Sequence, residues 1–161
     1  MIPRMKSDSA TVRSRGGGWV VVQFLLMLSL LFAGPFLRGH WNSAAGMAAG
    51  ISLVLLSAWL GLVGKRDLGR QRTPFPRPKD DAKLVTTGLY ARMRHPLYAA
   101  VIALGFGWAL LWQSWPAVVI AVLQVPFFDA KARNEEQWLR ERFPDYECYA
   151  RRVKRFVPGV Y

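Results

Sequence analysis

Three long uncharged runs constrain this chain more than any other feature of its sequence. Residues 19–37 hold 19 residues without a charge, residues 44–64 hold 21, and residues 97–128 hold 32. A helix that crosses a bilayer needs about 20 apolar residues. The first two runs therefore predict one membrane-spanning helix each. The third is too long for one span and predicts a helical hairpin, which either spans the bilayer twice or is partly re-entrant.

The distribution of basic residues predicts the topology. The chain carries 22 Lys and Arg residues and a formal net charge of +12, which in a soluble protein would suggest nucleic-acid binding. If the chain crosses four times, Arg38 is the one basic residue on the far side of the membrane. The positive-inside rule makes the basic side cytoplasmic. We therefore predict an all-α integral membrane protein with four spans, both termini in the cytoplasm, the lipid bilayer as its partner and no nucleic acid.

The polar segments divide the chain into a lead-in and one domain. Residues 1–18 are expected to be a flexible, basic, cytoplasmic N-terminus; the alternative is that residues 1–34 form a signal peptide. Residues 19–161 are expected to form a single membrane domain. Three alternate prolines in residues 73–78 predict an extended connector on the membrane surface, or a lid. Gly46 and Gly50 provide a small-residue surface, either for packing on the first helix or for dimerisation.

The C-terminal part of the chain is charged. We expect a charged helix over residues 130–142, separate from the hairpin, and a second helix over residues 146–157. The second helix has aromatic and apolar residues at intervals of three and four, typical of one helix face. These residues are Tyr146, Tyr149, Val153 and Phe156. The pattern indicates a basic interfacial helix on anionic lipid, or a segment that also holds an anionic group.

The densest group of polar residues flanks the hairpin. Arg94, His95 and Tyr98 lie where it starts, and Glu135 and Glu136 lie just past its end. Because a hairpin returns to the side it left, these two groups are expected to be neighbours. Cationic donors opposite two carboxylates suit a zwitterionic small molecule; the alternative is a ring of interfacial charges that staples the helix ends. No Gly-rich phosphate loop, metal-spaced Cys/His cluster or Ser-His-Asp arrangement is visible, so we assign no metal and no catalytic acid or base.

Two segments resemble the signatures of the isoprenylcysteine carboxyl methyltransferase family, whose wider group includes the phospholipid methyltransferases. The first segment covers residues 84–98 and contains Arg94-His95-Pro96-Leu97-Tyr98. The second covers residues 134–158 and contains the paired acids and the tail. Pro144 stands where relatives commonly have Gly. The resemblance covers about residues 70–158 and carries no motif in the first two helices.

The resemblance implies an integral membrane enzyme, of the kind found in a bacterial inner membrane, that uses S-adenosylmethionine. The acceptor would be a small lipophilic carboxylate, amine or thiol that reaches the site from the bilayer. Two alternatives stay open: a non-catalytic membrane protein that keeps the fold for binding or assembly, and an NADPH-dependent membrane reductase. The oligomeric state also stays open. Carried over residue by residue, the resemblance implies these cofactor-binding residues: Tyr90, Arg94, His95, Pro96, Leu97, Tyr98, Glu135, Glu136, Tyr146, Tyr149, Arg152 and Arg155.

Overall fold

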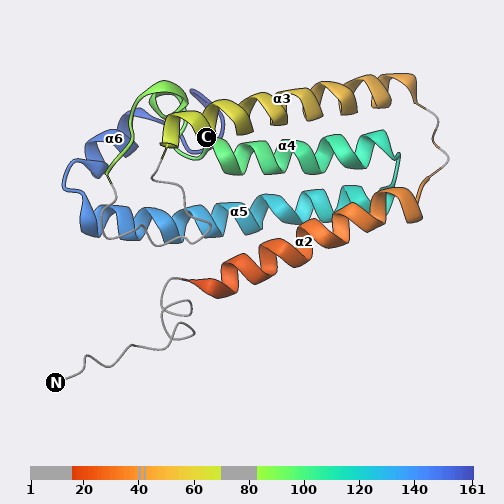
Figure 1. Ribbon diagram of the computed structural model, residues 1–161, viewed down its shortest axis with the longest axis horizontal. Coiled ribbons are helices and arrows are strands. Elements are labelled where there is room, and N and C mark those ends of the chain that lie inside the picture. Colours follow the sequence, from red (N-terminus) through yellow and green to blue (C-terminus); the bar gives the residue numbers. More distant parts are fainter. Residues whose placement is uncertain (1–15, 40, 42, 70–82) are drawn as a thin grey trace.

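The computed structural model describes residues 16–39, 41, 43–69 and 83–161, and these residues form an all-helical protein (Figure 1). The elements in chain order are α2 (Gly17–Phe36), α3 (Ala44–Leu68), the 3-10 helix η2 (Gly88–Ala91), α4 (Pro96–Leu111), α5 (Trp115–Arg142) and α6 (Tyr146–Arg152). Within the described ranges the all-α prediction is confirmed, and one isolated bridge is the only β-type pairing. The expectations for residues 1–15 and for the proline connector at 73–78 lie outside the described residues.

Three helices are long and apolar enough to cross a membrane: α2, α3 and α5. Helix α4 is a shorter apolar helix of 16 residues. Large apolar side chains of α2 and α3 point outwards, with Phe24 64% and Leu62 71% exposed, as expected for helices that face lipid tails. The protein is therefore an integral membrane protein by the length and composition of its helices. The fourth crossing and the orientation of the termini stay predictions.

Helix α4 lies at the centre of the bundle, between α3 and α5, and α2 packs across α5 and α4 (Figure 1). Small residues allow this close packing. A β-carbon at Gly50 of α3 would lie 3.0 Å from the backbone oxygen of Gly107 in α4. Gly50 therefore packs inside the chain, but its partner is α4, and the expected packing of this surface against the first helix is wrong; Gly46 faces Ser43 of its own helix start.

The predicted hairpin is formed by α4 and α5, which are joined by a tight turn. Gln113 has a positive φ of 53° in this turn. Ser114 caps α5: its hydroxyl accepts a hydrogen bond from the backbone N–H of Ala117 at 3.3 Å and donates one to the carbonyl of Ala33 at 2.9 Å. Pro116 occupies the first turn of α5, where its missing N–H costs nothing. The turn is thereby tied to α2 at the end of the bundle opposite α6.

Helix α5 does not end where the apolar run ends. It continues without interruption to Arg142, with Pro126 inside it, so the expected separate helix over residues 130–142 is wrong. A change from apolar to charged side chains does not break a helix, and the backbone group that a proline frees can be satisfied where neighbouring helices pack against it. As a consequence, Glu135 and Glu136 stand on a rigid extension of the hairpin.

Helix α6 is shorter than expected, since it ends at Arg152 and not at residue 157. The following residues run alongside the start of the hairpin, where Met93 and Lys154 form a parallel bridge. The N–H of Arg94 donates to the carbonyl of Lys154 at 2.8 Å, and the N–H of His95 donates to the carbonyl of Arg155 at 3.0 Å. These bonds replace those of a helix. The apolar spacing nevertheless identified buried residues correctly: Tyr146, Tyr149, Val153 and Phe156.

Candidate functional site

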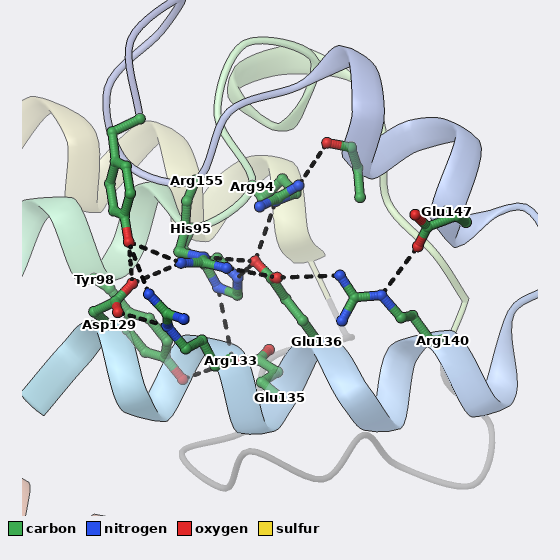
Figure 2. Close-up of polar contacts among 12 residues, drawn as sticks. Arg94, His95, Tyr98, Asp129, Arg133, Glu135, Glu136, Arg140, Glu147 and Arg155 are labelled. Atoms are coloured by element: carbon green, nitrogen blue, oxygen red, sulfur yellow. Dashed lines mark hydrogen bonds and ion pairs between the residues drawn. The ribbon is translucent and has the colours of Figure 1, made fainter.

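Three chain segments meet at the α6 end of the bundle and bring charged side chains together (Figure 2). The segment directly before α4 supplies Arg94 and His95, the extension of α5 supplies Glu136, and the segment after α6 supplies Arg155. The backbone pairing described above places Arg155 beside Arg94 and His95. The sequence-based expectation that the two ends of the hairpin are neighbours is thereby confirmed.

Glu136 is the centre of what we call the Glu136 cluster: Arg94, His95, Glu136 and Arg155. Its side chain is 1% exposed. The Arg155 guanidinium donates to both carboxylate oxygens, at 3.0 Å each, and His95 Nε2 lies 3.1 Å from Oε1. Arg94 Nε also lies 3.1 Å from Oε1, as an ion pair. A carboxylate this deeply buried requires such partners, because leaving it unpaired would cost several kcal/mol, on the order of 3–5.

Glu135 has a different environment, although it is the next residue in the chain. Its side chain is 26% exposed. The Tyr98 hydroxyl donates to Glu135 Oε2 at 2.7 Å, and His95 Nδ1 lies 3.8 Å from the same oxygen. The rings of His95 and Tyr98 stack with their centroids 5.3 Å apart and their planes 1° from parallel. Glu136 is thus fully enclosed by protein groups, whereas Glu135 is oriented by Tyr98 and still reaches solvent.

Asp129 closes the outer side of the cluster and was not identified from the sequence. Its Oδ1 accepts from Arg155 Nη1 at 2.6 Å and from the Tyr161 hydroxyl at 2.8 Å. The hydrogen bond from Arg155 to Glu136 raises the pKa of this guanidinium above its usual range, so Arg155 is always charged. The sequence spacing does indicate that Asp129 belongs to the cluster, because it precedes Glu136 by seven residues and therefore shares its helix face.

The tyrosines of the tail support the cluster from the α6 side. The Tyr149 hydroxyl donates to the backbone carbonyl of Tyr90 at 2.6 Å, and Arg94 Nη1 donates to the carbonyl of Ala150 at 2.6 Å. Tyr146 is 1% exposed. Burial raises the pKa of Tyr90, Tyr146 and Tyr149, that of Tyr149 to about 12, so the hydroxyls of these tyrosines stay neutral over the physiological range.

Some residues expected at the site lie elsewhere. Arg152 is exposed and its Nε donates to the carbonyl of Cys148 at 3.3 Å, within its own helix, so the structure does not bring it to the cluster. Pro96 begins α4, and Leu97 packs against Gly64 of α3. Both side chains are apolar and shape the start of the hairpin.

Lys131 was also missed from the sequence. It is 1% exposed, its ammonium donates to Gln23 Oε1 of α2 at 2.5 Å, and it lies 5.3 Å from the centroid of the Tyr98 ring. The sequence feature that could have identified it is its position four residues before Glu135, on the same helix face. Lys131 therefore links α2 to the wall of the site.

Two buried polar atoms at this end of the bundle have no hydrogen-bond partner: Asn134 Oδ1 and the Tyr146 hydroxyl. Arg94 Nε makes no hydrogen bond either, but it is ion-paired with Glu136 at 3.1 Å. Buried polar atoms are normally paired, and exceptions call for an explanation such as a ligand. An unpaired amide acceptor and an unpaired hydroxyl beside the charged side chains of the cluster suit a small molecule that carries both an anionic and a cationic group. No group of three His, Cys, Asp or Glu side chains in the described part of the chain is placed to hold a metal ion.

The fold and the cluster together define a helical membrane protein with an ionic site at one end of its bundle. Among known families, the phospholipid methyltransferase family matches residues 45–146 of the chain. The match contains α3, α4, α5 and the paired acids, and ends before Arg155. The chain belongs to this family of isoprenylcysteine and phospholipid methyltransferases, which confirms the resemblance seen in the motifs.

Individual relatives extend the match over most of the chain. A nickel-cobalt-cadmium resistance protein of Alcaligenes xylosoxydans is 31% identical over 159 residues, which is 95% of this chain and 68% of the relative. A cobalt-zinc-cadmium resistance protein of Cupriavidus metallidurans is 31% identical over 156 residues, with the same coverage of 95% and 68%. Protein-S-isoprenylcysteine O-methyltransferase B of Arabidopsis thaliana is 32% identical over 130 residues, 78% of this chain and 64% of the relative.

Proposed function

We propose that the protein transfers a methyl group from S-adenosylmethionine to a small lipophilic acceptor at the boundary between membrane and cytoplasm. The observation that carries this proposal is that two adjacent carboxylates, in a chain of this methyltransferase family, differ in their exposure and in their partners. Glu136 is 1% exposed and fully paired, while Glu135 is 26% exposed and held by Tyr98. A fixed carboxylate with access to solvent, beside a rigid cationic cluster, is suited to receive a charged ligand.

The donor set fits S-adenosylmethionine, which when bound supplies a methyl group on a positively charged sulfur. Glu135 and Asn134 Oδ1 are the groups suited to hold its ammonium. The Arg94 guanidinium, which Glu136 and the carbonyl of Ala150 hold in place, is the cation suited to pair with its carboxylate. Tyr98 supplies a flat ring beside Glu135. The proposed cofactor-binding residues thus keep most of the set expected from the motifs, with Asn134 added and Arg152 left out because of its position.

The chain contributes positioning rather than covalent chemistry. The Glu136 cluster fixes Arg94 and His95, and His95 in turn stacks on Tyr98, which orients Glu135. Holding two reactants in line accounts for a large share of the barrier reduction that an enzyme achieves. A carboxylate acceptor is already a nucleophile, and an amine or thiol acceptor can enter as the free amine or the thiolate, so no residue of the cluster is required to remove a proton. We therefore assign positioning roles to these residues and no general base.

The lipophilic character of the acceptor follows from where the site lies. The cluster stands at the end of helices whose outer faces are apolar, so an acceptor dissolved in the bilayer reaches it without leaving the membrane. The name of the plant relative describes methylation of isoprenylcysteine. The names of the two bacterial relatives describe metal resistance and no reaction. For this chain we propose the broader class of lipophilic carboxylates, amines and thiols.

Equilibrium binding of S-adenosylmethionine and of NADPH to the purified protein in detergent tests the proposal. We expect saturable binding of S-adenosylmethionine and none of NADPH. Arg94→Ala should weaken the binding about tenfold or more, the scale for a lost charge-assisted hydrogen bond. Arg151→Ala is the matched control, since that side chain is 78% exposed and lies outside the cluster. Binding of NADPH alone would indicate a reductase, and binding of neither would indicate a non-catalytic protein.

A further inference from the structure

Two facing rows of side chains lead from the ionic site into the membrane part of the bundle. On α4 the row has spacings of three and four residues: Tyr98, Val101, Gly105 and Trp108. On α5 the same spacings give the second row: Gln124, Phe128, Lys131 and Glu135. Residues at these spacings share one helix face. The rows touch at the site end, where Tyr98 contacts Glu135, Lys131 and Phe128.

At the far end of these rows lies a pocket of about 360 Å³ between α2, α4 and α5. This volume is in the range of sites that bind small molecules. Its α2 wall includes Phe24, Leu28 and Leu31, whose side chains are 64%, 37% and 52% exposed on the surface of the bundle. The pocket is therefore apolar and bounded by the helix face that meets lipid.

The pocket also has polar atoms that no protein group satisfies. Gln124 lines it and is 0% exposed, and neither its amide nitrogen nor its amide oxygen has a hydrogen-bond partner. The Nε1–H of Trp108, another lining residue, is buried and unpaired as well. The Gln124 oxygen lies directly against Gly105, where a β-carbon would collide with it. An unpaired amide within an apolar bundle is costly, so its retention calls for a partner.

We infer that this pocket binds the tail of the methyl acceptor, and that Gln124 and Trp108 form hydrogen bonds with a hydroxyl group carried by that tail. A hydroxyl both accepts and donates, so it suits two N–H donors and one carbonyl acceptor. Gly105 follows Tyr98 by seven residues, which at 1.5 Å per residue is about 10 Å along α4. The acceptor is then a hydroxylated long-chain lipophile, and its hydroxyl lies about 10 Å from Tyr98, measured along the axis of α4. This inference rests on the proposed function and names the class of its substrate.

Binding of two fatty acids of equal length tests the inference. Radiolabelled stearate and hydroxystearate with the hydroxyl at mid-chain are titrated against the full-length protein in lipid nanodiscs, with empty nanodiscs subtracted. We expect the protein to bind the hydroxy acid roughly fivefold to tenfold more tightly, the scale of one or two buried hydrogen bonds. Gln124→Leu should remove this preference and leave stearate binding intact. Trp108→Phe should reduce the preference independently, so the test does not depend on the folding of one variant.

Two further variants separate the pocket from the rest of the membrane surface. Leu31→Trp places a larger side chain in the α2 wall of the pocket and should weaken the binding of both fatty acids. Val119→Leu is the matched control, because Val119 is 58% exposed on α5 and does not line the pocket. Equal affinity of the unmodified protein for both fatty acids would overturn the inference. So would a preference that persists in both Gln124→Leu and Trp108→Phe.

Binding of S-adenosylmethionine by the same preparations separates this inference from the proposed function. A protein that binds S-adenosylmethionine but shows no preference for the hydroxy acid refutes the pocket assignment alone. A protein that prefers the hydroxy acid but binds no S-adenosylmethionine refutes the proposed function, and leaves the pocket as a lipid-binding site. Cofactor binding by the variants also shows that they are folded.

Discussion

The two adjacent carboxylates allow a prediction that separates an effect on the stability of the fold from an effect on ligand binding. Glu136→Gln removes the charge at the centre of the cluster, and Glu135→Gln is a matched change one residue away. Glu136 is 1% exposed and pairs with Arg94, His95 and Arg155, whereas Glu135 is 26% exposed and accepts one hydrogen bond from Tyr98. We expect Glu136→Gln to lower the stability of the fold and Glu135→Gln to lower the affinity for S-adenosylmethionine.

The size of each effect follows from the contacts. Removing one member of a buried ion pair costs about 3–5 kcal/mol. Arg155 keeps its bond to Asp129 at 2.6 Å, so the lower end, about 3 kcal/mol, applies to Glu136→Gln. A chain of this size loses roughly 2–4 °C of Tm per kcal/mol, which gives about 6–12 °C. Glu135→Gln loses about 1 kcal/mol of stability, or roughly 2–4 °C.

Thermal unfolding of the purified variants in one detergent, followed by tryptophan fluorescence, measures the first effect. Binding of S-adenosylmethionine well below both transitions measures the second. Here Glu135→Gln should weaken binding by about tenfold or more, the scale for a hydrogen bond to a charged group. Folded Glu136→Gln should change it less. Equal loss of Tm in both variants, or a loss of binding in Glu136→Gln at unchanged Tm, would refute the division of roles.

Three further predictions concern topology, the tail and pH. Reporter fusions after residues 40, 80, 114 and 161 should read outside, inside, outside and inside; a cytoplasmic reporter at 114 would show that the hairpin does not span. Deleting residues 153–161 removes Arg155 and should abolish S-adenosylmethionine binding while circular dichroism keeps its helical signal; normal binding by the truncated protein would exclude the tail from the site. Burial raises the pKa of Tyr149 from 10.0 to about 12, so its contribution to stability is complete below pH 10 and declines towards pH 12. Unfolding measured against pH should show this decline, and Tyr149→Phe should reduce it; an unchanged pH profile in the variant would contradict the assignment.

The sequence predicted the helices and the meeting of the charged groups, because both follow from strong local signals. Long uncharged runs define apolar helices, and a hairpin necessarily brings Arg94 and His95 near Glu135 and Glu136. The sequence did not distinguish the two glutamates. They are neighbours in the chain with the same side chain, and only the helix direction and the returning tail decide that Glu136 points inwards.

Other features depended on contacts that no local pattern shows. The periodic tail fits a helix over residues 146–157, but the open backbone groups of Arg94 and His95 pair with residues 154 and 155 and end the helix early. Helix α5 passes through Pro126 because packing in a bundle tolerates one lost backbone bond. The pocket at Gln124 forms where α2 crosses α4 and α5, and the crossing of helices distant in sequence is a tertiary property.

Transfer of a labelled methyl group tests the central claim most directly. The purified protein in nanodiscs is incubated with methyl-labelled S-adenosylmethionine and a lipid extract, and the label is then partitioned between an organic and an aqueous phase. We predict protein-dependent label in the organic phase, lost in Arg94→Ala and kept in the exposed-site control Arg151→Ala. Label that stays in the aqueous phase, or appears equally with both variants, would contradict methyl transfer to a lipophilic acceptor at this site.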